Sequence, residues 1–320
     1  MPSTVPSCER ASLSASAPAS PPASWTDDGR APRDHAANRL GILFMVVSLA
    51  CFVINDALIK ALGSELPLWQ TIFVRGVFAS IWIALALRLA RIPVIPRQHF
   101  RGPVIVRGLL DCLATFTYLS SLLHMPLGNA IAINMASPLM VTGLAVLMLR
   151  ERVDLMRWIA IMVGFGGVLL LIRPASDGFN AFALLCLFAT LVHSIRDLVT
   201  RRIANAIPSL VITLATALTI SLVSGLICLT LEWRDVSLRA IGLIAAASLF
   251  LTGGYFFVIR STRIGDLSAV APFRYSGLPI ALVIGWLVWD ERPDLIGWSG
   301  IALLIGAGLY LLHRERESRR

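Results

Sequence analysis

Long apolar segments recur along the chain from about residue 40 onward, with short polar connections between them. Each is roughly 18–25 residues long, enough for an α-helix to cross about 30 Å of hydrocarbon. Backbone groups in lipid must pair within the protein, and barrel strands would be about half this length. The pattern predicts an all-α polytopic membrane protein with ten transmembrane helices. The expected spans are 40–62, 68–88, 103–123, 128–149, 156–173, 179–201, 208–231, 239–260, 267–289 and 295–313.

The two ends of the chain differ in character from these spans. Residues 1–38 are rich in Ser, Ala and Pro, and they include the stretch "ASLSASAPASPPAS". Such a segment buries too little apolar surface to order itself, and no apolar stretch follows a basic start as in a signal peptide. We expect a disordered N-terminal tail, with a start assigned too far upstream as the open alternative. Residues 314–320 form a short basic tail.

Composition and charge agree with a membrane protein. The 320 residues are 57% hydrophobic and 15% charged, whereas soluble domains average about 45–50% and 25%. The net charge of +9 sits between the apolar segments rather than on one polar face, so no nucleic-acid partner is expected. With the N-terminus inside, four arginines fall in outer connections: Arg173, Arg234, Arg239 and Arg292. Eleven fall in inner ones: Arg88, Arg91, Arg97, Arg101, Arg150, Arg152, Arg157, Arg201, Arg202, Arg260 and Arg263.

This bias predicts that both termini of the multi-pass protein are cytoplasmic. The chain lacks HExxH, GxSxG and GxxxxGK[ST] motifs, so neither an enzyme nor an ATP-driven pump is expected. The cysteines form no CxxC pair, and we expect free thiols, no metal site and no cofactor. They are Cys8, Cys51, Cys112, Cys186 and Cys228.

The two halves of the chain repeat each other. "RERVDLMRW" (150–158) aligns with "DERPDLIGW" (290–298), and Asp56 aligns with Asp197. Five spans per half is an odd number, so the second half must enter the membrane in the opposite orientation. We therefore expect two inverted five-helix repeats, at 39–174 and 175–313.

The ends of the fourth and ninth spans, "ASPLMVTGLAVLMLRE" and "APFRYSGLPIALVIGWLVWDE", are each followed by a Gly-rich helix, "VGFGGVLLL" and "LIGAGLYLL". With these features residues 40–313 resemble the EamA family of the drug/metabolite transporter superfamily. "INDALIKALG", "VRGLL" and "APFRY" are similar to the branch that includes bacterial S-adenosylmethionine carriers, and a riboflavin-carrier branch is a more distant match. The resemblance implies an inner-membrane carrier with a central cavity and alternating access, without fixing its substrate.

Several charged residues fall inside predicted spans, for example in "VINDALIKAL" (53–62). An ionisable group at mid-bilayer costs about 2.5–3.5 kcal/mol, so it faces the protein interior and finds a partner. Asp56 and Arg75 lie at similar depth in consecutive antiparallel spans, which predicts an ion pair. We expect Lys60, one turn further out, to extend to the interface.

The inner half carries a second set of charges, and Asp111, Asp197 and Arg274 are expected to meet there with Arg196. Pro272 and Pro279 should bend the ninth span around Arg274. Arg274 is expected to hold a carboxylate and Tyr275 to stack on an aromatic group, and Asn134 beside Pro138 plays the matching part in the fourth span. A pair that merely fixes helix register is the open alternative for each. The candidates for substrate binding or gating are Asp56, Arg75, Asp111, Asn134, Asp197, Arg274 and Tyr275.

Other polar residues are expected to be structural. His124 and His193 are lone histidines, with a proton relay as the open alternative. Glu151 and Glu291 should anchor and cap their helices, with a role in gating as the open alternative. The glycines in 163–168 and 306–308 should allow close helix packing, and a homodimer through those helices stays open.

The function expected from the sequence is a secondary transporter for a small polar metabolite: an amino acid, nucleoside, vitamin or S-adenosylmethionine-like solute. A channel or a non-transporting scaffold is the alternative, and a membrane-embedded enzyme is a weaker one. Direction and coupling stay open.

Overall fold

The computed structural model describes residues 35–63, 65–92, 102–149, 155–172, 180–200, 207–265 and 267–318. The chain divides into two units, Met1–Ala36 and Ala37–Arg320, and the second holds all the features below. The predicted disordered tail lies almost wholly outside the described residues, as do Cys8, Glu151 and most arginines of the inner connections.

Regular structure in the described ranges is entirely helical. The helices are α1 (His35–Leu62), α2 (Leu68–Leu89), α4 (Gly102–Leu122), α5 (Leu127–Asn134), α6 (Ser137–Leu149), α7 (Leu155–Ile172), α8 (Ala181–Thr200), α9 (Ser209–Cys228), α10 (Leu238–Ile264), α11 (Leu267–Val270), the 3-10 helix η1 (Ala271–Ser276), α12 (Gly277–Trp289) and α13 (Leu295–Ser318). Within this part of the chain nine stretches are long and apolar enough to cross a membrane, and α7 contains a shorter apolar helix. The prediction of an all-α polytopic membrane protein is confirmed.

Large apolar side chains on the outer surface support this assignment. Ile81, Met162 and Leu222 lie in the middle of α2, α7 and α9, and their exposed fractions are 52%, 67% and 65%. In water such a surface would be unfavourable, whereas lipid solvates it without cost. These positions therefore face the hydrocarbon.

Two of the expected spans are interrupted rather than continuous. The ninth begins as α11, tightens into η1 at Ala271–Ser276, and continues as α12. Pro272 lies in the first turn of η1, where its missing N–H and its ring disfavour a regular α-helix. The fourth span breaks at 135–136, between α5 and α6, and Pro138 then lies in the first turn of α6, which tolerates proline.

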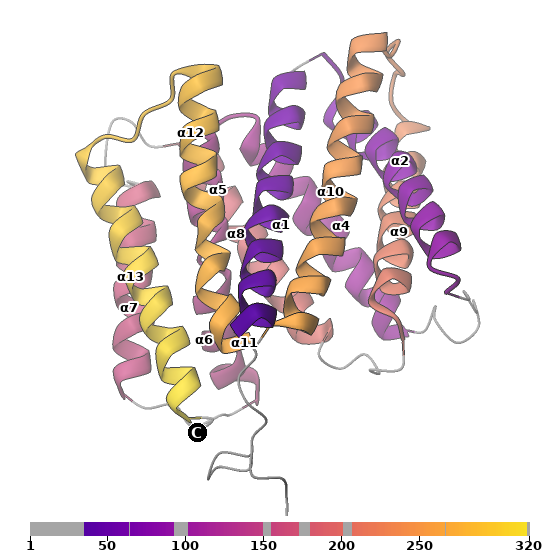
Figure 1. Ribbon diagram of the computed structural model, residues 1–320. Helices are drawn as coiled ribbons and strands as arrows, with labels where there is room; N and C mark the ends of the chain where they lie inside the picture. The colour runs from indigo at the N-terminus through magenta and orange to yellow at the C-terminus, as the bar shows by residue number, and fades with distance from the viewer. Residues whose placement is uncertain are drawn as a thin grey trace, which may run out of the picture. The chain divides into compact units, whose positions relative to one another are not determined.

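Equivalent helices of the two halves pack against each other. The predicted repeats make α2 the counterpart of α9 and α7 the counterpart of α13. Helix α2 packs on α9, and α7 packs on α13. Two further contacts correspond to each other: α4 packs on α9, and α10 packs on α2. Helices α2 and α9 both begin directly after a proline, Pro67 and Pro208. The start of α1 and the end of α13 lie at the same lower end of the bundle (Figure 1).

Helix α5 lies at the centre of the largest core cluster. Leu127, Ala130, Ala132 and Ile133 are fully buried on its faces. Its neighbours are α8, α12 and α7, so it is enclosed by both halves of the chain. The break that follows α5 is therefore held deep inside the protein, at the level of a polar cavity.

The glycines expected to allow close helix packing do so in residues 163–168 but not throughout residues 306–308. Gly167 of α7 faces the backbone of Gly300 in α13, where any Cβ would collide with the opposing carbonyl. In the expected "GAG" stretch, Gly306 faces open space. Gly308 instead leaves room for the side chain of Tyr275. The close contact between α7 and α13 thus uses Gly300, which the sequence analysis did not select.

Candidate functional site: a polar cavity between two closures

A cavity of about 370 Å³ lies inside the bundle, lined by residues of both halves. Its polar lining includes Asp56 of α1, Arg75 of α2 and Asp111 of α4, together with Asn134 at the end of α5. Its apolar walls include Leu49, Phe52 and Ile131. A pocket with apolar walls and a few polar groups is the usual form of a small-molecule site.

The Asp56 carboxylate is held by neutral donors. Its Oδ2 accepts a hydrogen bond of 2.8 Å from the Tyr118 hydroxyl, and its Oδ1 accepts one of 2.8 Å from Asn55 Nδ2. Asn55 is 2% exposed and Tyr118 is 6% exposed, so this arrangement is well shielded from solvent. The expected ion pair between Asp56 and Arg75 is not formed.

The position of α10 explains why that prediction is wrong. Ser48 Oγ of α1 donates to Gly254 O of α10 at 2.8 Å, and Ser261 Oγ of α10 donates to Gly41 O of α1 at 2.7 Å. Helix α10 also packs along α2, so it lies between α1 and α2 (Figure 1). Helices α1 and α2 are therefore not neighbours, although they are consecutive in the chain. Asp56 and Arg75 stay apart even if they lie at the same depth in the membrane.

Arg75 lines the cavity without a direct partner. The residue is 8% exposed, and among the described residues its guanidinium makes no hydrogen bond or ion pair. The carboxylates that act on it electrostatically are those of Asp56 and Asp111, neither in contact. A buried cation without a direct partner is costly, so a ligand that supplies acceptors would be favoured here.

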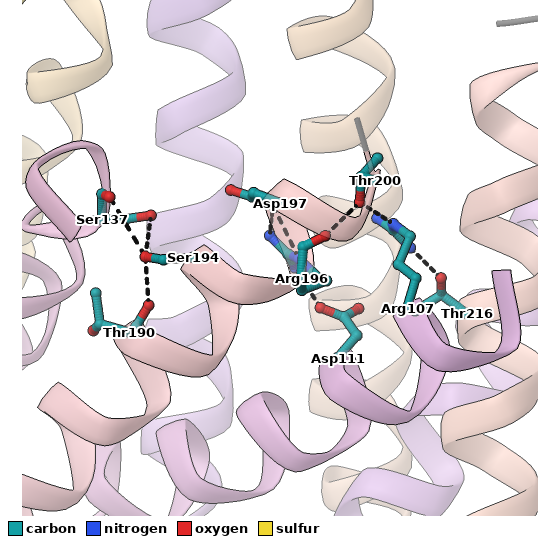
Figure 2. Close-up of polar contacts among 9 residues, drawn as sticks. All are labelled: Arg107, Asp111, Ser137, Thr190, Ser194, Arg196, Asp197, Thr200 and Thr216. Atoms are coloured by element: carbon teal, nitrogen blue, oxygen red, sulfur yellow. Dashed lines mark hydrogen bonds and ion pairs between the residues drawn. The ribbon is translucent and has the colours of Figure 1, made fainter. Parts of the chain in front are cut away.

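Arg196 of α8 has two carboxylate partners. Its Nη1 pairs with Asp111 Oδ1 of α4, and its Nε and Nη2 donate to Asp197 Oδ1 at 3.0 and 2.7 Å. Figure 2 shows Arg196 between the two aspartates. The structure thus brings Asp111, Arg196 and Asp197 together, whereas the fourth expected member, Arg274, makes none of these contacts.

Arg107 is a polar residue of this region that the sequence analysis did not select. Its Nε donates to Thr200 Oγ1 of α8 at 3.0 Å, and its Nη1 donates to Thr216 Oγ1 of α9 (Figure 2). It is 9% exposed and lies one turn before Asp111 on α4. The signal was present in "VRGLL", where an arginine falls inside an apolar span.

The joint binding role expected for Arg274 and Tyr275 stays a prediction. Both line the cavity, and Arg274 is exposed. The Tyr275 hydroxyl, however, lies against Gly308 of α13 and has no hydrogen-bond partner among the described residues. The Tyr275 side chain therefore packs against α13 while it also lines the cavity.

A second polar cluster closes the end of the bundle where α1 and α12 end. Lys60 Nζ pairs with Glu291 Oε1 and donates to Met125 O at 2.7 Å. Glu291 Oε2 accepts from the Leu127 N–H at 2.8 Å, and the Lys60 ammonium lies 5.1 Å from the ring centroid of Trp289. We call these contacts of Lys60, Glu291, Met125 and Leu127 the latch, and this end of the bundle the latch end.

The latch corrects two predictions. Lys60 does not extend to the interface, because its side chain is only 10% exposed and turns inward to a carboxylate on the second half of the chain. Glu291 does more than anchor α12, since it connects α1, the start of α5 and the connection after α12. Beside the latch, Leu62, Leu66 and Ile244 form a buried apolar cluster.

The opposite end, where α4 begins and α8 ends, is called the basic end. Here the Asp197 side chain is 40% exposed, and Arg274 is also exposed. Toward the latch end, the lining residues Asn55, Thr115 and Tyr118 are at most 8% exposed. The cavity therefore opens toward the basic end and is closed at the latch end.

Within the described ranges no three His, Cys, Asp or Glu side chains are placed to hold a metal ion, and Cys51, Cys112, Cys186 and Cys228 are free thiols. His193 lines the cavity near Tyr118, and the His124 ring stacks on Phe182 with centroids 4.0 Å apart.

Comparison with known proteins identifies the family. The EamA-like transporter family matches residues 39–173 and 180–313, nearly the whole bundle in two copies. This chain belongs to the EamA-like transporter family. The expected family assignment is confirmed, and this EamA protein is a membrane transporter rather than an enzyme.

Several curated transporters resemble this EamA protein. The S-adenosylmethionine uptake transporter of Rickettsia prowazekii is 27% identical over 87% of this chain and 94% of its own length. The riboflavin transporter of Brucella anthropi is 27% identical over 77% of this chain and 90% of its own. The pseudopaline exporter CntI of Pseudomonas aeruginosa is 27% identical over 86% and 97%. One solved crystal structure aligns with a TM-score of 0.58 and 17% identity, covering 89% of this chain and 99% of its own, which shows the fold alone.

Proposed function

We propose that this EamA protein is a secondary carrier that moves a small polar metabolite across the inner membrane by alternating access. The observation that carries the proposal is a polar cavity lined by both halves of the chain, whose lining side chains are exposed at the basic end and buried toward the latch end. The relatives named above are carriers of small metabolites in either direction, which supports the substrate size class and leaves direction open.

In this mechanism the described state is open at the basic end. Opening of the latch end requires Lys60 to leave Glu291 and the Met125 carbonyl, which releases α1 from α12 and α5. Closure of the basic end would bring α4, α8 and α9 together around Arg196 and Arg107, which already connect these helices. With both termini cytoplasmic, as the arginine bias favours, the basic end faces the cytoplasm.

Counterflow in proteoliposomes tests the proposal. Vesicles that contain the purified protein would be loaded with one unlabelled solute and diluted into the same labelled solute, using S-adenosylmethionine, riboflavin and the amino acids in turn. A carrier gives saturable uptake with a transient overshoot for at least one solute, whereas a channel gives uptake that does not saturate, and a scaffold gives none. Either of those two results would overturn the proposal.

Accessibility of a single cysteine tests the direction in which the cavity opens. Thr213 lines the cavity and its hydroxyl bonds only to Ser209 O within its own helix, so Thr213→Cys in a cysteine-free background is a mild substitution. A membrane-impermeant thiol reagent should react with this cysteine from the basic end and not from the latch end. Equal reaction from both ends in the absence of substrate would contradict alternating access.

A further inference from the structure

We infer that the cavity binds a zwitterion, with the acidic group of the solute on Arg75 and its cationic group facing Asp56. The inference rests on the proposed carrier function, because it names the substrate class of the same cavity.

Arg75 is the buried guanidinium that is free to take an acidic group. The other two buried or partly buried arginines of the lining are occupied: Arg196 pairs with Asp111 and Asp197, and Arg107 donates to two threonines. Arg75 is 92% buried and has no direct partner among the described residues. A planar guanidinium with several free N–H groups suits a carboxylate, which accepts two parallel hydrogen bonds.

Asp56 supplies the opposite charge. Its carboxylate accepts hydrogen bonds from Tyr118 and Asn55, which are neutral, and it has no ion pair in the described part of the chain. The hydroxyl and the amide hold the carboxylate in place without neutralising it. A cationic group of the solute would therefore be favoured beside Asp56.

The separation of the two charges gives the inference its specificity. Asp56 and Arg75 line one cavity from α1 and α2, yet they are not in contact. A solute with a single charge would supply a direct partner to one of them and leave the other without one. A zwitterion compensates both and adds no net charge to a low-dielectric site.

The walls indicate the character of the solute body. Phe52 and Tyr255 both line the cavity and pack edge to face, with ring centroids 5.3 Å apart. Leu49 and Ile131 extend the apolar surface. An apolar or aromatic body between the charged groups and the wall would bury surface here.

Matched compounds test the charge requirement on the purified full-length protein. The probes are leucine, methionine and phenylalanine, their methyl esters, which carry only the cation, and their N-acetyl derivatives, which carry only the anion. Binding would be measured by titration calorimetry and by the rise in melting temperature at millimolar concentration. At least one free amino acid should bind about ten- to a hundred-fold more tightly than its ester and its N-acetyl form, the loss expected for one charge-assisted hydrogen-bonding group.

Two variants assign each end of the solute. Arg75→Met should remove the preference for the free amino acid over its methyl ester, and Asp56→Asn should remove the preference over the N-acetyl form. If Arg75 and Asp56 had only structural roles, each substitution would lower the affinity for all three forms of the amino acid by a similar factor. The preference for the free amino acid over the other two forms would then remain. Arg234→Met is the matched control, because Arg234 is an exposed arginine outside the cavity lining. This variant should keep the preference for the free amino acid over both derivatives. If Arg75→Met does not fold, Arg75→Lys should retain the charge and lose about ten-fold in affinity for the free amino acid.

The outcomes separate the two proposals. No binding by any free amino acid, or equal binding of all three forms, would overturn the zwitterion inference. If a neutral or singly charged solute nevertheless shows saturable counterflow, the carrier function stands and only the substrate class fails. If free amino acids bind but no solute shows counterflow, the carrier function fails while the binding site stands.

Discussion

The latch end and the basic end both rely on buried charged groups, but the groups are arranged differently. At the latch end, one lysine and one glutamate join α1 to the second half of the chain and also bind two backbone groups, Met125 O and the Leu127 N–H. At the basic end, Arg196 divides its donors between Asp111 on α4 and Asp197 on its own helix. The latch pair is 10% and 20% exposed, whereas Asp197 is 40% exposed.

This difference indicates which end is closed and how each end is held. Lys60 shares its donors between a carboxylate and a backbone carbonyl, so we expect these contacts to be lost together if the latch opens. Arg196 can lose one carboxylate and keep the other, so the basic end can change its packing in steps. We expect substitutions at the two ends to differ in the size and character of their effects.

The largest effect is expected for Lys60→Met. It leaves Glu291 with only the Leu127 N–H and removes the ion pair between α1 and the connection after α12, while the hydrogen bonds between α1 and α10 remain. Removal of one partner of a buried pair costs about 3–5 kcal/mol, and we expect about 3 kcal/mol because Glu291 is partly exposed. Unfolding in mixed micelles would measure the loss, and Thr213→Cys in this variant should become reactive from the latch end.

The control for Lys60→Met is Arg239→Met at the same end of the bundle. Arg239 pairs with Glu65, but the two side chains are 63% and 36% exposed, so its loss should cost less than about 1 kcal/mol. Equal destabilisation by the two substitutions, with no change in labelling, would show that the latch does not close the cavity.

A smaller effect is expected for Asp111→Asn at the basic end. The side chain of Asp111 is 6% exposed, and the substitution removes the negative charge that pairs Arg196 with α4, but Arg196 retains Asp197. We expect a cost of about 2 kcal/mol, in the range for a hydrogen bond to a charged group. Mixed-micelle unfolding is again the measurement, and a cost as large as that of Lys60→Met would mean that the two ends are held equally firmly.

Thr216→Val tests the second connection at the basic end. It keeps the side-chain shape and removes one of the two threonine acceptors of Arg107, while Thr200 remains. The expected cost is about 1 kcal/mol. Thr213→Val is the matched control on the same helix, because Thr213 bonds only within its own helix and the change should be nearly neutral. Equal effects of the two valine variants would argue against a role for the Arg107–Thr216 contact.

The smallest effect is expected for Asp197→Asn. Asp197 is the more exposed partner and contacts Arg196 from the adjacent position of the same helix, so its loss should cost less than about 1 kcal/mol. A thermal melt beside that of Asp111→Asn would measure the difference. A larger loss for Asp197→Asn would show that Asp197, rather than Asp111, holds Arg196 in place.

Part of the site could be predicted from the sequence because depth in a membrane follows from position along a helix. That reasoning placed Asp111, Arg196 and Asp197 at one level and Asp56 and Arg75 at another. It failed for the partner of Asp56, and it missed the partner of Lys60, because depth does not say which helices are neighbours. The partner of Lys60 lies 231 positions away in the chain, beyond any helical spacing that the sequence displays.

The sequence by itself determined the helical class, the family, most of the helix boundaries and the irregular backbone at Pro272. These follow from local properties: the length of apolar segments, the missing N–H of proline, and repeated residue patterns. Only the tertiary structure decided which charges are paired and which have no direct partner. Helix α10 lies between α1 and α2, so Asp56 and Arg75 stay apart, and packing between the two halves brings Lys60 to Glu291. Side-chain partners depend on neighbours in space, and the order of helices in a bundle is set by the packing of all their faces at once.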